Sequence, residues 1–469
     1  MNRFITALTL AIAALPTFAI TVDWTCSTDA EQWRNGGNVE ITPYDRHVPN
    51  DILITNYTDQ QIQGFGACFN ELGWIALGHL DKQTRNSILN DLFSPEGANF
   101  TINRTPIGAN DFATEWYSYD ETDGDFELKR FSIKHDKRNL IPYIKAALKI
   151  NPDMKLWASP WSPPQWMKTN RHYSNRADKL NGLSPDKEVP TGNDQFIQEE
   201  KYLRTYSKYF SRYVEEYAKK GIKISMIQFQ NEPYTFNIWP NTSWTPKGMT
   251  NFIGNYLGPE FEKNHPDVEL WLGTLNTNNM EHIDFMLNHP TASKYIKGIG
   301  FQWEGKDVVD DVHRKYLDLP IIQTENECGS GDNDWKAAEY TFSLIKKYIQ
   351  GGASIYTYWN MVLQDECLST WGWSQNALFV VDSKAKTVRC TPEYYVMKHF
   401  SHFVKPGAMR LHLMGLTDKT LAFRNPDGSV ICVMHNPDDS ARKVAITFGD
   451  SVITVNLEPH SFNTFTINE

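Results

Sequence analysis

Two glutamates stand where apolar runs of the sequence end, and they are the side chains best suited to chemistry. Glu232 follows "ISMIQFQN" and precedes Pro233, and Glu325 follows "PIIQT". An unpaired carboxylate is costly to bury, so its place beside an apolar run needs a reason. Two facing carboxylates can cleave a glycosidic bond, because one protonates the leaving oxygen and the other faces the anomeric carbon. A separation of about 5 Å would retain the anomeric configuration, and a larger one would invert it.

Other polar and aromatic side chains follow apolar runs in the same way. They are carboxylates, amides and tryptophans, which together could hold the hydroxyl groups and ring faces of a sugar. If the runs are parallel strands of one barrel, these residues surround a single mouth, because barrel enzymes carry function at the C-terminal strand ends. In chain order they are Asn70, Glu71, Asn110, Asp111, Trp161, Asn231, Gln302, Trp303, Glu327, Trp359 and Asn360.

The apolar runs predict eight strands, each followed by a helical pattern or by a loop that leads to one. They are continuous rather than alternating, which is typical of parallel strands covered on both faces. Eight βα units in succession predict a (β/α)8 TIM barrel of the α/β class. An open doubly wound sheet is the alternative, but "GFGACF" lacks the G-x-G-x-x-G spacing of its phosphate loop. The predicted strands span residues 61–69, 99–105, 154–159, 224–230, 268–274, 296–303, 320–325 and 353–359.

Helices and a second domain can also be read from the pattern. Apolar residues from Tyr202 to Tyr217 fall three and four apart, and another amphipathic helix is predicted over 334–352. After about residue 404, short alternating runs and turn signals such as "NPDG" predict an antiparallel sandwich. We therefore expect a β-sandwich side domain built from both chain ends, 20–55 and 404–469, attached to a catalytic barrel over 56–403.

Composition narrows the location and the partners. Residues 1–19 carry a basic residue, an apolar run and a small-x-small site, so a signal peptide and a secreted or periplasmic protein are expected. No later run approaches ~18 apolar residues, so no membrane span is predicted. The net charge of −10 disfavours a nucleic-acid partner. The six cysteines form no C-x-x-C pair and no His/Asp cluster has metal-ligand spacing, so neither metal nor cofactor is expected, and disulfide pairing stays open.

Four motifs fall in register on the predicted strand ends: "GFGACFNE", "ASPWSPPQWMKTN", "FQNEP" and "QTENECG". Together they resemble glycoside hydrolase family 30, the retaining β-glycosidases that include the glucosylceramidases, from about residue 20 to the C-terminus. The resemblance implies that Glu232 is the general acid/base, that Glu325 is the nucleophile and that Asn231 bonds the sugar 2-hydroxyl. Gln302 and Trp303 replace the His/aromatic pattern of part of the family and are expected beside the nucleophile. The resemblance also implies that four side chains line the subsite of the non-reducing sugar: Glu71, Asp111, Trp161 and Trp359.

Several of these assignments have a structural alternative. Glu327 competes with Glu325 as the nucleophile, although Glu325 lies nearer the apolar core of its strand. Glu71 and Asp111 could instead cap the helices or loops that follow them, because acids are favoured near helix N-termini. Trp161 could simply pack, although three prolines hold it on a rigid loop.

The expected function is that of a secreted retaining β-glycosidase that cleaves β-glucosidic bonds by double displacement. The substrate would be a β-glucoside, a glucosylceramide-like lipid or a β-1,6-glucan; β-xylosides, β-fucosides and other β-glycans are alternatives that the subsite loops decide. A carbohydrate-binding protein without catalysis is disfavoured, since both glutamates are present. The polar loop 169–194 is expected on the catalytic rim, where it could narrow the cleft. His135 and His399 fall in predicted helices and are expected to be structural.

Overall fold

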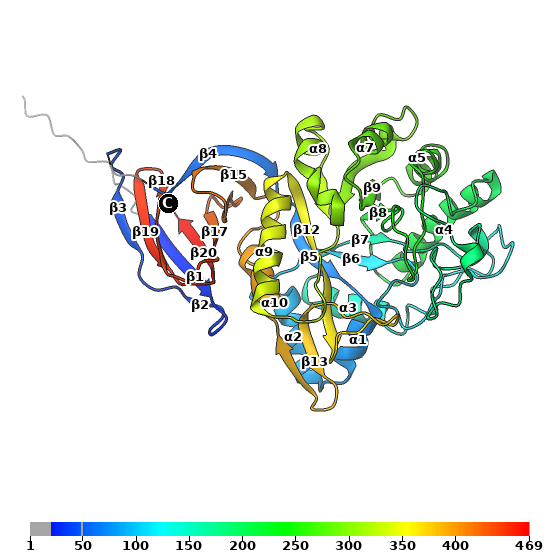
Figure 1. The fold of residues 1–469 in the computed structure, drawn as a ribbon, viewed down its shortest axis with the longest axis horizontal. Coiled ribbons are helices and arrows are strands. Elements are labelled where there is room, and N and C mark those ends of the chain that lie inside the picture. The colour runs from blue at the N-terminus through cyan, green and yellow to red at the C-terminus, as the bar shows by residue number, and fades with distance from the viewer. Residues whose placement is uncertain (1–19, 48–49, 469) are drawn as a thin grey trace, which may run out of the picture.

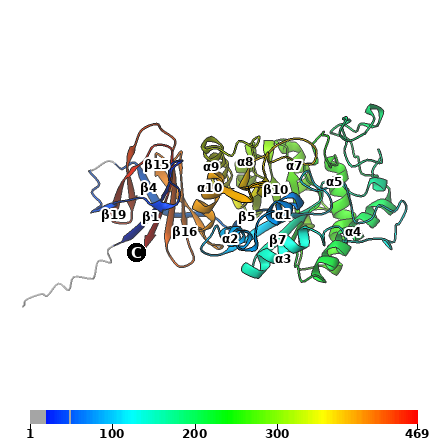
Figure 2. The same cartoon turned by 90° about the horizontal axis from the view of Figure 1, so that it is seen from below.

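The computed structural model describes residues 20–47 and 50–468 and has two domains placed end to end (Figures 1 and 2). The larger domain is a barrel of parallel strands surrounded by helices, and the smaller one contains only strands. The expected signal peptide, residues 1–19, lies outside the described residues. Within the described part of the chain, none of the helices combines the length and the apolar character that crossing a membrane requires.

Eight parallel strands close the barrel, because β12 pairs with both β5 and β11. This confirms the predicted barrel and excludes the open sheet. Each of the eight predicted strands overlaps one strand of the barrel. The barrel strands are β5 (Gly64–Cys68), β6 (Ile102–Pro106), β7 (Lys155–Ser159), β8 (Met226–Gln228), β9 (Glu269–Leu275), β10 (Ile296–Phe301), β11 (Ile321–Gln323) and β12 (Ala353–Gln364).

Amphipathic helices cover the outside of the barrel. The two helices predicted from periodicity are confirmed as α4 and α9; α4 buries its row of aromatic residues, and the Asp334 side chain accepts from Ala337 N to begin α9. The helices are α1 (Glu71–Gly78), α2 (Lys82–Phe93), α3 (Leu140–Ile150), α4 (Glu200–Ala218), α5 (Pro246–Phe252), α6 (Gly258–Asn264), α7 (Met280–Leu287), α8 (Val309–Lys315), α9 (Trp335–Gln350) and α10 (Pro392–Ser401).

Shorter elements complete the barrel domain. A hairpin of β13 (Ala377–Asp382) and β14 (Thr387–Cys390), which the sequence pattern did not predict, extends the sheet beyond β12. A π-helical turn, η3 (Ile253–Leu257), joins α5 to α6. The 3-10 turns are η1 (Gln165–Met167), η2 (Pro185–Lys187), η4 (Ser293–Tyr295) and η5 (Trp303–Asp307).

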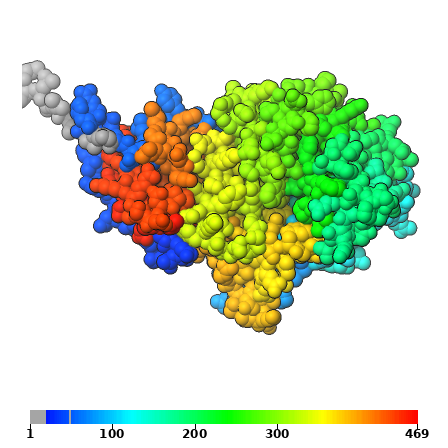
Figure 3. Space-filling model, viewed as in Figure 1, coloured from blue at the N-terminus to red at the C-terminus, as the bar shows by residue number. Residues whose placement is uncertain are grey.

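The side domain is built from both ends of the chain, as predicted. Its strands are hydrogen-bonded in the order β2-β1-β20-β17-β16-β15-β4-β18-β19-β3, and they enclose a separate apolar core that includes Trp24, Ile54 and Phe465. The segments from the two chain ends, blue and red, form one lobe in Figure 3. The strands are β1 (Thr21–Ser27), β2 (Arg34–Asn35), β3 (Glu40–Pro43), β4 (Ile52–Gln61), β15 (Met409–Gly415), β16 (Thr420–Arg424), β17 (Val430–Asn436), β18 (Arg442–Phe448), β19 (Ser451–Leu457) and β20 (Ser461–Asn468).

Strand β4 connects the two domains. It pairs with β15 and β18 of the side domain along most of its length and leads, after two residues, into barrel strand β5. The expected domain boundary between residues 55 and 56 falls inside this strand, since its residues beyond 55 still pair with β15.

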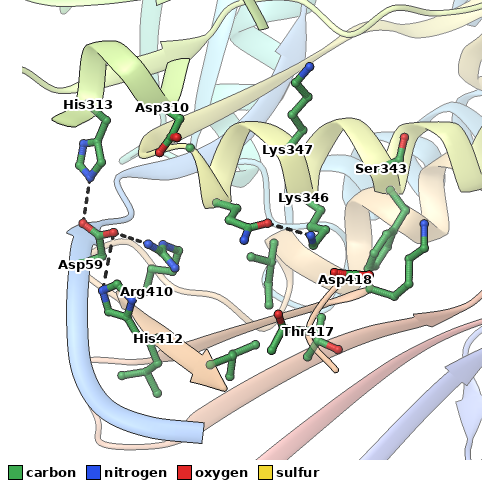
Figure 4. A pocket seen from close by; sticks show the side chains of 18 of the residues that line it. Asp59, Asp310, His313, Ser343, Lys346, Lys347, Arg410, His412, Thr417 and Asp418 are labelled. Carbon is green, nitrogen blue, oxygen red and sulfur yellow. Dashed lines mark hydrogen bonds and ion pairs between the residues drawn. The ribbon is translucent and has the colours of Figure 1, made fainter. Parts of the chain in front are cut away.

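A groove of about 850 Å³ lies between the domains, where α8 and α9 face β15 and β16 (Figure 4). At one end the Asp59 carboxylate of β4 accepts from His313 Nε2 of α8 at 2.9 Å and forms an ion pair with Arg410 of β15. One side chain of the connecting strand therefore holds a barrel helix and a side-domain strand together.

The two histidines expected to be structural lie in different settings. His399 is in α10, as predicted, and its ring nitrogens contact Thr464 Oγ1 at 2.8 Å and Ser27 Oγ at 2.9 Å in the side domain. His135 is not in a helix, because the chain makes turns until α3 begins at Leu140. All six cysteines are free thiols.

Candidate active site

A cavity of about 580 Å³ opens at the C-terminal ends of the barrel strands. Carboxylates and aromatic rings dominate its walls, and among the described residues that line it there is no Lys, Arg or His. Its carboxylates belong to Asp111, Glu232, Glu304 and Glu325. Its aromatic rings belong to Trp161, Tyr234, Phe236, Trp239, Trp303 and Trp373.

Glu232 is aimed into the cavity by an unusual backbone conformation. Its φ is 47°, a region that side chains with a Cβ seldom adopt. Hydrogen bonds on both sides hold the chain there: Asn231 N donates to Pro160 O at 2.8 Å, and Glu232 N donates to Thr274 O at 3.1 Å. Thr235 Oγ1 then donates to Glu232 Oε2 at 2.8 Å and orients the carboxyl group. Such strain persists where the surroundings over-determine it, which is common at functional sites.

One amide group connects the two glutamates. Gln302 Nε2 lies 2.8 Å from Glu232 Oε1 and 3.4 Å from Glu325 Oε2, so these oxygens are at most about 6 Å apart. Thr324 Oγ1 donates to Gln302 Oε1 at 2.7 Å and fixes which end of the amide faces the carboxylates. The spacing fits retaining glycosidases and is shorter than inverting enzymes need, since those must fit a water molecule between the groups.

Glu325 has a buried cation as its partner. Arg104 NH1 donates to Glu325 Oε2 at 2.7 Å, and the Arg104 side chain is fully buried. The other nitrogens of the guanidinium donate to Ser159 Oγ and, at 2.7 Å, to Asn231 Oδ1. Its planar fork therefore fixes the positions of Glu325 and Asn231 together.

Three tryptophans surround the same guanidinium. The Arg104 Cζ atom lies 4.8 Å from the ring centroid of Trp157, 4.3 Å from that of Trp161 and 5.4 Å from that of Trp359. These cation–π contacts help to compensate the desolvation of a buried charge. Arg104 was not among the residues predicted for the site, and the signal was an arginine inside the predicted strand "NFTINRT".

The two glutamates differ in the partners that govern their protonation. Burial raises the pKa of both; for Glu325, Arg104 opposes this, while the negative charges of Glu232 and Asp111 add to it. Only Glu325 has a cation within hydrogen-bond distance, whereas Glu232 receives bonds from the neutral groups of Gln302 and Thr235. These partners therefore favour the charged form of Glu325 and the protonated form of Glu232, although burial raises the pKa of both.

Asn231 is oriented by three donors that all reach its carbonyl oxygen. Arg104 NH2 donates to Oδ1 at 2.7 Å, Thr274 Oγ1 at 3.0 Å and Gln302 Nε2 at 3.3 Å. The amide nitrogen has no hydrogen bond to the described residues, and Asn231 lines the cavity. Its N–H groups are thus available to a hydroxyl group of a bound molecule.

The remaining predicted residues fall into two groups. Asp111, Trp161 and Trp303 line the cavity. Burial raises the pKa of Asp111 to about 7, and its Oδ1 atom is buried without a partner among the described residues. Trp359 lies behind Trp161, with the ring centroids 5.5 Å apart, and is not part of the cavity wall.

Glu71 does not line the cavity. Its buried carboxylate accepts from Thr114 N and Oγ1 at 3.0 and 3.1 Å and from Asn139 Nδ2 at 2.9 Å, and His135 Nε2 lies 3.0 Å from both of its oxygens. Burial raises the pKa of Glu71, but these bonds outweigh it and hold the pKa below its usual value. Glu71 thus anchors the loop that carries Asp111, and His135 is one of its partners.

Glu327 is likewise occupied outside the cavity. Lys306 Nζ donates to Glu327 Oε1 at 2.8 Å and Tyr340 OH to Oε2 at 2.5 Å. Because Glu327 does not line the cavity, it is a poor candidate for the nucleophile, whereas Glu325 faces the cavity.

The polar loop 169–194 supports one wall of the cavity. Asn175 Nδ2 donates to Thr235 O at 2.7 Å, and Asn181 Nδ2 donates to Ile238 O at 3.1 Å. The wall that it supports carries Trp239, whose ring lies 4.6 Å from that of Trp373 between centroids. Among the residues that the structure describes, no group of three or more His, Cys, Asp or Glu side chains could hold a metal ion.

Known families match both domains of this chain. The model of the glycosyl hydrolase family 30 TIM-barrel domain matches residues 62–404, and that of the family 30 β-sandwich domain matches residues 407–465. The chain belongs to glycosyl hydrolase family 30. It is a glycoside hydrolase, and retention of the anomeric configuration is general for this family. The resemblance found in the sequence motifs is thereby confirmed.

Three relatives illustrate the range of this family 30 enzyme's neighbours. The chain is 32% identical over 402 residues to putative glucosylceramidase 1 of Caenorhabditis elegans, covering 80% of this chain and 74% of that protein. It is 27% identical over 417 residues to the endo-1,6-β-D-glucanase neg1 of Aspergillus fumigatus, covering 85% of this chain and 81% of that one. The crystal structure of SrfJ from Salmonella typhimurium has the same fold, with a TM-score of 0.84 at 24% identity, covering 95% of this chain and 99% of that one.

Proposed function

We propose that this enzyme hydrolyses β-glucosides of primary alcohols by double displacement, with Glu325 as the nucleophile and Glu232 as the general acid/base. The observation that carries the assignment is the difference in partners between two carboxyl groups that contact the same Gln302 amide. Glu325 is paired with Arg104, which favours the ionised form that a nucleophile needs. Glu232 has only neutral donors, which suits an acid that must begin protonated.

The substrate class is supported by what two relatives share. One is named a glucosylceramidase and the other an endo-1,6-β-D-glucanase. In both named substrates the glycosidic oxygen joins glucose to a primary carbon, which is C1 of the ceramide or C6 of the next glucose. A primary alkoxide is a poor leaving group, so cleavage depends on protonation by the acid.

The first step proceeds as follows. Glu232 gives its proton to the glycosidic oxygen while Glu325 attacks the anomeric carbon, and a glucosyl-enzyme ester forms as the alcohol leaves. Asn231 donates its free N–H to the sugar 2-hydroxyl, Asp111 accepts from hydroxyl groups farther round the ring, and Trp161 presents an aromatic wall. In the second step Glu232, now ionised, takes a proton from water, which displaces Glu325 and releases β-glucose.

Secretion is part of the same proposal. The signal-peptide pattern of residues 1–19 supports export to the periplasm or the medium. Expressing the gene in its own host and sequencing the N-terminus of the exported protein tests this. A mature chain that begins near residue 20 is expected, and a cytoplasmic chain that keeps residues 1–19 would contradict it.

The experiment that tests the activity compares glucose disaccharides that differ only in linkage. Gentiobiose (β-1,6) is expected to be cleaved much faster than cellobiose (β-1,4) or laminaribiose (β-1,3), because only gentiobiose releases a primary alcohol. Proton NMR of the first product formed should show the β-anomer. Equal rates on the three disaccharides, or cleavage confined to aryl β-xylosides or β-fucosides, would overturn the substrate assignment.

A further inference from the structure

Glu304 is a carboxylate of the cavity to which the proposed steps give no role. It lies in η5, two residues after Gln302, and it is exposed at the rim of the cavity. No described residue forms an ion pair or a hydrogen bond with its side chain, so its charge is free to meet a bound molecule.

The local backbone holds Glu304 in this position. Trp303 adopts a φ of 51°, a strained value for a residue with a Cβ, and Gly305 N closes the turn on Gln302 O at 3.0 Å. The nearest cation in the sequence, Lys306, points away and pairs with Glu327 at 2.8 Å. The turn therefore presents a carboxylate to the cavity and directs the neighbouring ammonium group elsewhere.

Glu304 lies on the side of the cavity where the alcohol portion of a substrate would bind. Asp111 follows the second barrel strand and Glu304 follows the sixth, so they stand on opposite sides of the mouth. Asp111 carries the buried, unpartnered oxygen that suits sugar hydroxyls. The charge of Glu304 also acts on the acid Glu232, which faces the leaving oxygen, and raises the pKa of Glu232 beyond the larger effect of burial.

The carboxylates and the aromatic rings that line this cavity both favour a cation. Four carboxylates line it, and no basic side chain is among the described residues that line it. Since Glu325 is paired with Arg104 and Glu232 favours its protonated form, the free negative charge on this side of the cavity is that of Glu304. Six aromatic residues line it as well, and the faces of such rings attract ammonium groups. Carboxylates together with aromatic faces form the surroundings that recognise an ammonium group, and they repel an acidic sugar.

We propose that Glu304 is a specificity-determining residue, which makes the enzyme prefer β-glucosides whose primary alcohol carries an ammonium group. This rests on the proposed function, since it concerns the leaving portion of the same substrate. With glucose held beside Asp111 and its glycosidic oxygen at Glu232, the chain of the alcohol extends toward Glu304. A charge–charge contact at such an exposed position increases kcat/KM by about fivefold.

The test uses three β-D-glucosides of similar length: 3-aminopropyl, 3-hydroxypropyl and 2-carboxyethyl. kcat/KM is measured for the native enzyme, for Glu304→Gln and for the control Asp307→Asn. Asp307 lies in the same turn, pairs with Lys347 and does not line the cavity, so its replacement removes an equal charge. We expect the native enzyme and the control to prefer aminopropyl over hydroxypropyl about fivefold, and carboxyethyl to be the poorest substrate.

In Glu304→Gln the aminopropyl preference should fall to nearly one. The alkaline limb of the pH profile for the hydroxypropyl glucoside should also move to lower pH, because Glu232 loses a repelling neighbour. Adding about 0.5 M NaCl should shrink the native preference, since salt screens exposed charges. If Glu304→Gln prefers the aminopropyl glucoside as strongly as the native enzyme does, or if the native enzyme shows no such preference, the proposal for Glu304 is overturned. Cleavage of the hydroxypropyl glucoside would still uphold the proposed function in that case. If none of the three is cleaved, both proposals fail.

Discussion

Replacing Arg104 by methionine tests whether this buried cation keeps the nucleophile ionised. The substitution preserves much of the volume between the three tryptophans but removes the 2.7 Å salt bridge to Glu325. Leaving one charge of a buried pair uncompensated costs about 3–5 kcal/mol. Since one pKa unit corresponds to about 1.4 kcal/mol, the pKa of Glu325 should rise by roughly 2–3.5 units. Each unit by which the pKa of Glu325 rises above the pH of the assay should lower its ionised fraction, and with it kcat/KM, by about tenfold.

The assay is kcat/KM for an aryl β-glucoside from acid to alkaline pH. The acid limb of this profile reports ionisation of the nucleophile in the free enzyme, so it should move to higher pH in Arg104→Met. Arg104→Lys is the matched variant, because it keeps the charge and loses the fork that reaches both Glu325 and Asn231. It should restore much of the limb position without restoring the full rate. An Arg104→Met enzyme that is folded by thermal melting and has an unmoved acid limb would refute the reasoning.

Three further substitutions test other parts of the structure. Glu232→Gln should lower the steady-state kcat/KM for gentiobiose about 1,000-fold. It should slow formation of the glucosyl-enzyme from a 2,4-dinitrophenyl glucoside, followed by stopped flow, far less, because that leaving group needs no proton. Equal losses in the two measurements would contradict this. Glu71→Gln should lower the free energy of unfolding by about 2 kcal/mol in urea titrations, because an amide cannot accept from all of its present donors, and an unchanged midpoint would argue against the anchoring role. Burial lowers the pKa of His399 from 6.5 to about 3 in the folded state, so as the pH falls the unfolded state takes up a proton first and stability is lost below pH 6.5. Between pH 7 and 5 the free energy of unfolding of the native protein should therefore fall by about 2 kcal/mol more than that of His399→Gln. Parallel curves of stability against pH for the two proteins would contradict this.

The barrel was predictable because its strands are buried on both faces and polar residues lie at or just after the ends of most of them. The runs around Ile227 and Ile322 are continuous and apolar, and no local feature competes with a strand there. The β13–β14 hairpin was missed because eight strands already complete a barrel, and nothing local indicates that "ALFVVD" would extend β12 beyond it. The continuation of β4 past the expected boundary could not be foreseen, because its pairing with β15 depends on the far end of the chain, which periodicity does not reveal.

The residues of the site also divide into those that could be predicted from the sequence and those that could not. That Glu232 and Glu325 share one cavity was predictable because strand ends in a barrel converge, which is a property of topology alone. Arg104 sits inside β6, and its contact with Glu325 depends on how side chains from different strands meet within the barrel. Glu71 has the right position in its motif, but His135, Asn139 and Thr114 come from an irregular segment whose course the sequence pattern did not indicate.

The place of the barrel between the two halves of the side domain has a consequence for biosynthesis. Strands β1, β3 and β4 are translated first, but their partners β20, β19, β15 and β18 come only after the barrel has been made. Until then these early strands expose unpaired edges, which are prone to aggregation. A chain released before residue 461 lacks β20 and leaves all seven residues of β1 without their β20 partners, so that only the short pairing with β2 remains. Loss of the C-terminal codons that encode β20 should therefore lower the soluble yield of the protein, although β20 is distant from the active-site cavity.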